Sequence, residues 1–316
     1  MDVITDPSQA RPPAEGTVVT IGAYDGVHVG HQAVIADVRR LAAERGCRSA
    51  VVTFDRHPAT VVRPESAPKL LTDLDQKLEL LEAQGVDMTV VITFDEARSK
   101  EEPEDFVQEV LIDALAARAV VVGADFHFGH HRRGNVALLR ALGERAGFEV
   151  DGVELLPRPD GVAEPVSSTA IRRALAGGLV EAAQVMLGRP HEVRGVVVMG
   201  DQRGRTIGFP TANVNVPTAI ALPADGVYAG WYERPNGEVH ACAINLGRRP
   251  TFYEHADHSL LEAHLLDFSG DLYGEQARIR FTNFLRSERK FAGVDELVAQ
   301  LRHDVATARQ MTLGPG

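Results

Sequence analysis

Apolar residues in the first half of the chain follow two alternating spacings. Continuous apolar runs, typical of buried parallel strands, occur at residues 17–21, 48–54, 88–94, 119–122 and 149–155. Apolar residues at helical spacing occur between these runs, at 32–46, 73–84, 104–117 and 135–147. Strands that alternate with helices predict an α/β fold, in which helices cover both faces of a parallel sheet. Ligands then bind at the carboxyl ends of the strands.

The pattern changes after a short predicted helix at 179–187, which Gly188-Arg189-Pro190 ends. We therefore expect two domains, 1–187 and 188–316. The second contains short strand-like runs, with a hairpin turn at Pro235-Asn236-Gly237 and a closing amphipathic helix at 295–308. The runs lie at residues 191–199, 226–232, 239–244, 259–266 and 277–281. This spacing predicts a small antiparallel barrel or sandwich.

Length and cysteine content agree with this division. A chain of 316 residues favours about two domains. We expect neither a membrane span nor a signal peptide, because no apolar run approaches about 20 residues and residues 1–16 are polar. Cys47 and Cys242 belong to no Cys-x-x-Cys pair, which excludes a disulfide framework and a cysteine zinc site. A reducing, cytoplasmic location is therefore expected.

The net charge of −11 is unevenly distributed. Residues 1–185 carry 19 basic and 29 acidic side chains, whereas residues 186–316 carry 14 and 15. Neither part has the basic surplus of a general nucleic-acid binder, so no nucleic-acid partner is expected. Much of the acidity lies in 95–113, most simply as a solvated helix face.

The most informative stretch is Gly22-Ala-Tyr-Asp-Gly-Val-His-Val-Gly-His31, between the first predicted strand and the first helix. The N-terminus of a helix attracts anions, and glycines let a phosphate approach the backbone. Imidazoles can stabilise an oxygen that gains charge in a transition state. The stretch is neither a Gly-x-Gly-x-x-Gly fingerprint nor a Walker loop. By pattern alone, a phosphate site and a pair of solvated histidines both remain open.

Three further loops of the first half carry polar groups after strands or before a helix. Thr53-Phe-Asp-Arg-His-Pro58 is either a structural loop or a binding loop, and Gly123-Ala-Asp-Phe-His-Phe-Gly129 precedes two arginines that suit a polyanion or lie in solvent. Ser167-Ser-Thr-Ala-Ile-Arg172 supplies good helix caps. An arginine one turn into that helix can also hold a triphosphate.

Three constellations stand out in the second half. The glycine-rich loop 200–208 could wrap phosphates or form a plain turn. In Phe209-Pro-Thr-Ala-Asn213, a hydroxyl and an amide carbonyl two residues apart could ligate Mg²⁺, with a plain turn as the alternative. Glu262 and His264 are expected on one face of a strand together with Leu266. A strand carboxylate of this kind is often simply exposed to solvent.

Together these motifs resemble the bacterial bifunctional riboflavin kinase/FMN adenylyltransferases. The first half is similar to the nucleotidylyltransferase signature, with Tyr24 in place of the usual Phe and Arg56 in place of a usual Pro. The second half resembles riboflavin kinase in 200–213, 245–252, the Glu262 strand and 286–291, with Leu246 where Ile is commoner. The resemblance implies a Rossmann-like nucleotidylyltransferase domain followed by a small β-barrel domain with a C-terminal helix.

The resemblance also implies an activity for each half. The second would phosphorylate riboflavin to FMN with ATP, and the first would transfer an adenylyl group from ATP to FMN, giving FAD and pyrophosphate. Glu262 would be the base that activates the ribityl hydroxyl, since an alcohol is a poor nucleophile until it loses a proton. The FMN phosphate is already ionised, so adenylyl transfer needs alignment and charge neutralisation by His28, His31 and Arg172.

The remaining implied residues fall into three groups. ATP and its phosphates would be bound by Gly22, Asp25, Gly30, Ser168, Thr169, Gly200, Gly204, Arg205 and Gly208. The flavins would be bound by His57, Asp125, Asn245, Arg248 and Arg286. Mg²⁺ with ATP would be held by Thr211 and Asn213. Alternatives are a single retained activity, transfer to another phosphate-bearing acceptor, or a non-catalytic flavin- or nucleotide-binding regulator. The sequence does not specify the oligomeric state or the coupling of the two sites.

Overall fold

The computed structural model describes residues 1–154, 156–158, 160–247 and 260–312. Contacts within the chain define two compact units, Met1–Ser168 and Thr169–Gly316. The domain boundary predicted from the sequence follows residue 187. Helix α7 (Ser168–Ala176) from Thr169 onward and helix α8 (Val180–Leu187) fall in the second unit. Helix α8 packs against two strands of this unit, and Ala224 donates a backbone hydrogen bond to Leu175 of α7.

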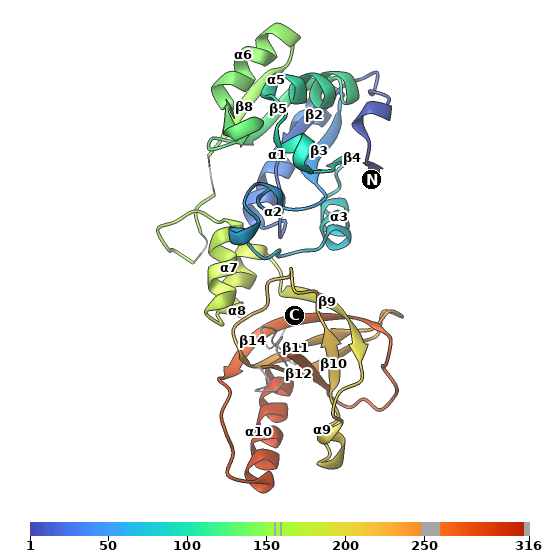
Figure 1. The fold of residues 1–316 in the computed structure, drawn as a ribbon, viewed down its shortest axis with the longest axis vertical. Coiled ribbons are helices and arrows are strands. Elements are labelled where there is room, and N and C mark those ends of the chain that lie inside the picture. The colour runs from blue at the N-terminus through green and yellow to red at the C-terminus, as the bar shows by residue number, and fades with distance from the viewer. Residues whose placement is uncertain (155, 159, 248–259, 313–316) are drawn as a thin grey trace. The chain divides into compact units, whose positions relative to one another are not determined.

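A six-stranded parallel sheet forms the centre of the first unit. Its order is β1-β4-β3-β2-β5-β8 (Figure 1). The strands are β1 (Asp2–Ile4), β2 (Thr17–Ile21), β3 (Arg48–Phe54), β4 (Met88–Ile92), β5 (Ala117–Gly123) and β8 (Glu149–Val153). The chain passes from β2 to β3 and β4 on one side, and then returns to β5 on the other side of β2. In open α/β sheets such a reversal marks the crevice where ligands bind.

Helices cover both faces of this sheet, as the sequence predicted. Alternate strand residues such as Val19 and Ile21 pack on one face against α5 (Pro103–Phe106), which continues directly into the π-helix η3 (Val107–Ala114), and against α6 (Val136–Ala146). The opposite face, which includes Val18, is covered by α1 (Val29–Arg45) and α3 (Leu74–Ala83). Both layers are closely packed and hold the strand ends in fixed positions.

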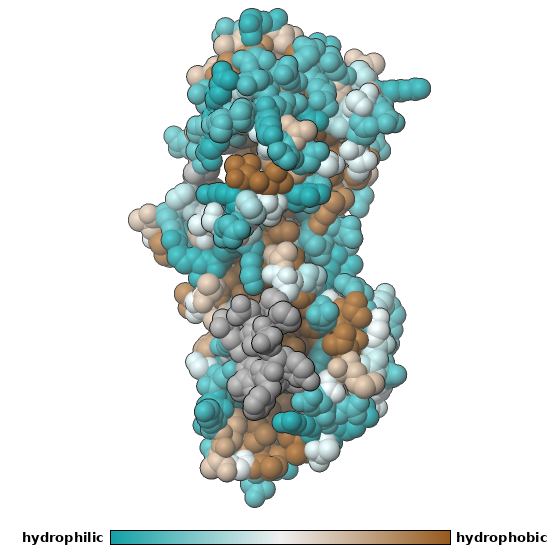
Figure 2. Space-filling view, viewed as in Figure 1, coloured by the Kyte–Doolittle hydropathy of each residue, from teal (hydrophilic) through white to brown (hydrophobic). Residues whose placement is uncertain are grey.

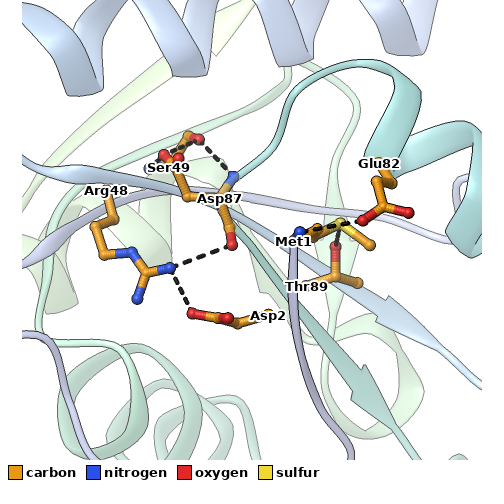
Figure 3. Close-up of polar contacts among 7 residues, drawn as sticks. All are labelled: Met1, Asp2, Arg48, Ser49, Glu82, Asp87 and Thr89. Atoms are coloured by element: carbon orange, nitrogen blue, oxygen red, sulfur yellow. Dashed lines mark hydrogen bonds and ion pairs between the residues drawn. The ribbon is translucent and has the colours of Figure 1, made fainter.

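The amino-terminal edge of the sheet contains a strand that the polar sequence of residues 1–16 did not predict. Strand β1 pairs with β4, and contacts outside the ladder hold it: the Met1 ammonium lies 3.1 Å from Glu82, and Arg48 pairs with Asp2 (Figure 3). Asp87 accepts hydrogen bonds from the backbone N–H and hydroxyl of Ser49 nearby. Pairing with an existing strand overrides the weak strand signal of this segment.

Several short elements of the first unit also escaped the sequence analysis. They are the helical turns η1 (Pro7–Gln9), α2 (Ala59–Val62), η2 (Pro64–Ser66), α4 (Glu96–Ser99) and η4 (His130–Arg132), and the two-residue strands β6 (His127–Phe128) and β7 (Gly134–Asn135). Elements of two to four residues are too short to show a periodicity.

The second unit is a closed antiparallel barrel in the order β10-β13-β12-β11-β14-β9. This confirms the barrel alternative over the sandwich. The strands are β9 (His191–Val198), β10 (Ala212–Asn215), β11 (Gly226–Glu233), β12 (Val239–Gly247), β13 (Leu260–Leu265) and β14 (Gln276–Arg286). Tyr228, Tyr232 and Phe281 are fully buried in it, and α10 (Val294–Thr312) packs against β11, β12 and β14. The turn α9 (Arg203–Thr206) joins β9 to β10.

Two details of the barrel differ from the predictions. Asn213, which was placed in a possible turn, lies inside β10 and pairs with both β13 and β9. Leu266 does not share the face of Glu262, because β13 ends at Leu265 and Leu266 is buried.

On the face drawn in Figure 2, the described residues form no large apolar docking surface. Hydrophobic residues gather there only in small, separate groups among hydrophilic ones (Figure 2). No helix in the described part of the chain is long and apolar enough to cross a membrane.

Candidate active sites

The loop after β2 presents two stacked histidines at the start of α1. His28 is the N-cap of this helix, and its Nδ1 accepts a hydrogen bond from the backbone N–H of His31 at 3.3 Å. The two rings stack with centroids 3.5 Å apart. A Cβ on Gly30 would lie 3.2 Å from the His28 ring, so glycine allows this close approach. The first turn of α1 carries no acidic side chain that would repel a phosphate.

His31 is suited to act as a neutral hydrogen-bonding group. Its pKa is well below the usual histidine value, mainly because burial disfavours the charged ring and also because His28 and Lys77 are nearby. Its Nδ1 is buried and has no hydrogen-bond partner within the described ranges of the chain. An unsatisfied buried nitrogen is costly, which marks His31 as a candidate functional group.

Asp25 holds the loop through its carboxylate. Its oxygens accept hydrogen bonds from the backbone N–H groups of Leu71 and Thr72 at 2.9–3.1 Å, and its side chain is buried. The carbonyl of Asp25 accepts a hydrogen bond from the Ser168 hydroxyl at 2.9 Å. The structure therefore brings together the Gly22–His31 loop, residues 71–72 and Ser168.

Tyr24, which replaces the usual Phe, points its hydroxyl away from the loop and into the sheet. The hydroxyl shares a 2.7 Å hydrogen bond with Thr20 of β2, and both side chains are buried. The Tyr24 ring packs over Gly22, where a Cβ would come within 3.1 Å of it. The extra hydroxyl is thus satisfied by the strand.

A small pocket opens beside this loop at the carboxyl ends of β2 and β3. His57 lines it, and its Nδ1 accepts a hydrogen bond from the backbone N–H of Ala59. Arg56, the replacement for a usual Pro, folds back to pair with Asp55, whose carboxylate also accepts from the backbone N–H of Phe94. The pocket is lined by Ala23, Asp25, Asp55, Arg56, His57, Leu70, Thr72, Leu74 and Lys77.

Other predicted residues of the first activity lie elsewhere. Asp125 is exposed in the loop after β5, at the neighbouring strand end. Thr169 and Arg172 lie in the first turns of α7, directly after Ser168 in the chain but in the second compact unit.

Three polar residues form a row across the barrel wall. Glu262 of β13 is the ladder partner of Asn213 on β10 and of Asn245 on β12. Directly paired residues of adjacent strands project from the same face of a sheet, with their Cβ atoms about 5 Å apart. The structure therefore brings together the predicted base, one predicted Mg²⁺ ligand and one predicted flavin-binding residue.

The glycine-rich loop lies next to this row. A Cβ on Gly200 would lie 2.4 Å from the side-chain nitrogen of Asn213, so a larger residue there would displace the Asn213 amide. Gly204 lies on α9 close to the Thr211 hydroxyl, and Arg205 on the same turn is exposed. Gly208 follows this turn with a positive φ of 87°.

Two predicted flavin-binding residues have different outcomes. The Arg286 guanidinium is bound by the carboxylate of Asp304 from α10, with contacts of 2.7–3.1 Å. Arg248 lies outside the described residues. Glu288, two residues after Arg286, hydrogen-bonds Asn245. Its pKa is raised mainly by burial and further by the nearby carboxylates of Asp225 and Glu262.

Three residues at these sites, Lys77, Glu288 and Asp304, were not predicted from the sequence. Lys77 had a detectable signal, because it lies three residues after Leu74 and four before Leu81, on the apolar face of its helix. Glu288 lies inside a quoted motif. Asp304 gave no local signal, since its partner lies 18 residues away.

Comparisons with known proteins agree for both halves of the chain. A family model described as FAD synthetase matches residues 10–170, and one described as riboflavin kinase matches residues 187–312. The bifunctional riboflavin kinase/FMN adenylyltransferase of Bacillus subtilis is 39% identical over 291 residues, covering 91% of this chain and 90% of that protein. The protein of the same description from Haemophilus influenzae is 37% identical and covers 98% of both chains.

A solved structure shares the fold over the whole chain. The crystal structure described as a macrolide-efflux protein from Streptococcus pneumoniae has a TM-score of 0.85 and 29% identity, and the match covers 97% of this chain and 98% of that one. Because two family models and near-full-length relatives agree on both halves, this chain belongs to the family of bifunctional riboflavin kinase/FMN adenylyltransferases.

Proposed function

We propose that the residues described above carry out both steps from riboflavin to FAD, with ATP as the second substrate of each. The observation that carries the proposal is that each half presents one coherent polar site: stacked histidines at a helix N-terminus, and the Asn213–Glu262–Asn245 row on the barrel wall.

In the first step, Glu262 takes the proton from the terminal ribityl hydroxyl of riboflavin. The resulting oxygen attacks the γ-phosphorus of ATP, the bond between the β- and γ-phosphates breaks, and ADP leaves. Asn245, beside Glu262, orients the flavin chain, and Glu288 holds the amide of Asn245 through its hydrogen bond.

Thr211 and Asn213 fit Mg²⁺, because they offer hard oxygen donors at the start of one strand next to a carboxylate. When bound with ATP, this ion would neutralise phosphate charge. Gly200, Gly204, Arg205 and Gly208 would bind the phosphates beside it. Arg248 and Arg286 remain predicted flavin-binding residues, and the ion pair of Arg286 supports a role in fixing α10 as well.

In the second step, an FMN phosphate oxygen attacks the α-phosphorus of ATP and pyrophosphate leaves. The N-terminus of α1, with His28 and His31, stabilises the charge that develops on the α-phosphate. Gly22, Gly30, Ser168, Thr169 and Arg172 bind the triphosphate, and the backbone of Asp25 lines this site. His57 and Asp125 bind FMN at the neighbouring strand ends.

We further place the enzyme in the cytoplasm, where ATP is available. The two free cysteines, Cys47 and Cys242, support a reducing compartment. No nucleic acid or membrane is proposed as a partner.

A chromatographic time course with riboflavin, ATP and Mg²⁺ tests the proposal. We expect FMN to rise first and FAD to follow. FMN without FAD would contradict the adenylyl-transfer assignment. If folded protein forms neither FMN nor FAD, the result favours the alternative of a non-catalytic flavin- or nucleotide-binding regulator.

A further inference from the structure

Lys77 is a buried cation that the proposed mechanism does not use. It lies on α3, and only 7% of its surface is exposed. Its ammonium donates to the Phe54 carbonyl at 2.6 Å, the Thr53 hydroxyl at 3.2 Å and the Ala23 carbonyl at 3.3 Å. An ammonium has three N–H groups, and these three oxygens match that number.

The three oxygens belong to two separate loops of the candidate site. Ala23 is the second residue of the Gly22–His31 loop, whereas Thr53 and Phe54 end β3 and lead into the loop that carries His57. The Thr53 hydroxyl also donates to the Ala23 carbonyl at 3.0 Å. The ammonium therefore joins the loop proposed for ATP to the loop proposed for FMN, and it lines the pocket beside them.

This arrangement is costly for stability. Burial lowers the pKa of Lys77 to about 8, although the carboxylates of Asp25 and Asp55 favour its charge. A leucine or methionine would fill the same helix face without this cost. A strongly perturbed group that lines a pocket and joins its walls is typical of functional sites.

We propose that Lys77 is a positioning residue for adenylyl transfer. By fixing the two loops to each other, it sets the distance between the FMN phosphate and the α-phosphate of ATP. The inference rests on the proposed assignment of these loops. Misplacement of reacting groups by about 1 Å can cost about 100-fold in rate, so loss of the three Lys77 hydrogen bonds has a large effect although the Thr53–Ala23 hydrogen bond remains.

The test compares Lys77→Met, which removes the donors, with Lys77→Gln, which keeps two N–H groups without the charge. We expect kcat for FMN adenylylation to fall about 10- to 100-fold in Lys77→Met and less in Lys77→Gln. The KM values for ATP and FMN should change by less than about threefold, since binding to each loop is retained. Riboflavin phosphorylation by the same polypeptide should stay within about twofold and reports folding of the second unit, whereas a thermal melt of each variant reports folding of the first unit, which contains Lys77. Lys100→Met, at an exposed lysine of the same unit, is the matched control.

The pH profile gives a second readout. The charged and titratable groups around the ammonium are Asp25 before α1, Asp55, Arg56 and His57 after β3, and His31 on α1. Adenylylation by the wild type should fall above about pH 8, because a neutral amine has two N–H groups for three oxygens. This fall in rate at alkaline pH, the alkaline limb of the profile, should be absent from Lys77→Met.

Three results would overturn the inference. One is wild-type kcat in Lys77→Met, and another is an unchanged alkaline limb in that variant. The third is a parallel loss of both activities in both variants, which would make Lys77 a purely structural residue. His31→Ala is measured alongside: if it retains adenylylation, the proposed function of the loop fails, whatever Lys77 shows.

Discussion

Asp304 binds Arg286 through both of its carboxylate oxygens, at 2.7–3.1 Å, and thereby ties α10 to the end of β14. The Asp304 side chain is 4% exposed, so this ion pair is largely shielded from water. Removing one partner of a buried pair leaves the other charge uncompensated.

Asp304→Asn should therefore lower the free energy of unfolding by about 3 kcal/mol. Urea denaturation followed by fluorescence of Trp231, on β11 beside this helix, measures the loss. The double variant Arg286→Met/Asp304→Leu should recover most of it, because no unpaired charge remains. A loss that is equal in the single and double variants would contradict this account.

Glu262→Gln should reduce riboflavin phosphorylation at least about 100-fold, because the amide cannot accept the ribityl proton. FMN adenylylation should stay within about twofold, since the substitution lies in the barrel. Separate assays started from riboflavin and from FMN measure the two rates. Glu275→Gln, on the loop before β14, is the control. Loss of both activities in Glu262→Gln would contradict the split assignment.

His31→Ala should show the reverse pattern. Adenylylation should fall about 100-fold or more, because a group that stabilises the charged transition state is lost. Phosphorylation of riboflavin should be unaffected. His303→Ala, at an exposed histidine of α10, should leave both rates near wild type.

Tyr24→Phe should leave adenylylation unchanged, because the Tyr24 hydroxyl bonds Thr20 inside the sheet and does not line the pocket. Stability should fall by about 1 kcal/mol, the cost of leaving the Thr20 hydroxyl unpaired. The double variant Tyr24→Phe/Thr20→Val should recover the lost stability, because no hydroxyl is left unpaired. A marked change in kcat for FAD formation would show that the hydroxyl has a catalytic role.

Asp87→Asn tests the amino-terminal edge of the sheet (Figure 3). Burial raises the pKa of Asp87, but the hydrogen bonds from Ser49 outweigh it and the net pKa lies below 3.8. The charged carboxylate therefore stabilises the fold above pH 3.8, and this stabilisation is lost as the pH falls through the lowered pKa. We expect Asp87→Asn to be less stable at pH 7 and to have a shallower acid limb in thermal melts. An unchanged acid limb would contradict this role.

The repeating pattern of the chain was sufficient to predict the main fold. Continuous apolar runs predicted the buried strands, and apolar residues at helical spacing predicted the helices that cover them. The parallel sheet and its packed helices confirm these predictions. Strand β1 and residue Asn213 were missed as strand because their pairing depends on partners far along the chain.

The site residues show the same difference between local motifs, which the sequence reveals, and contacts with distant parts of the chain, which it does not. Local motifs placed His28 and His31 at the start of the first helix and Glu262 on a strand, where the structure has them. The bonds of Lys77 to Ala23 and Phe54 and of Arg286 to Asp304 connect separate elements, and no local spacing encodes them. The residues proposed for the chemistry can therefore be predicted from the sequence. The residues that hold them in place are harder to predict.

The division between the compact units falls inside the segment Ser167–Arg172. A chimera of two family members joined at that division would take Ser168 from one parent, and Thr169 and Arg172 from the other. A junction after residue 187 would keep the segment intact, but would place α7 and α8 on a foreign barrel. Exchange of the two activities between relatives therefore requires the loops and strands that receive these helices to be transferred as well. Recombination of this pair of modules is constrained by packing even where the family motifs are identical.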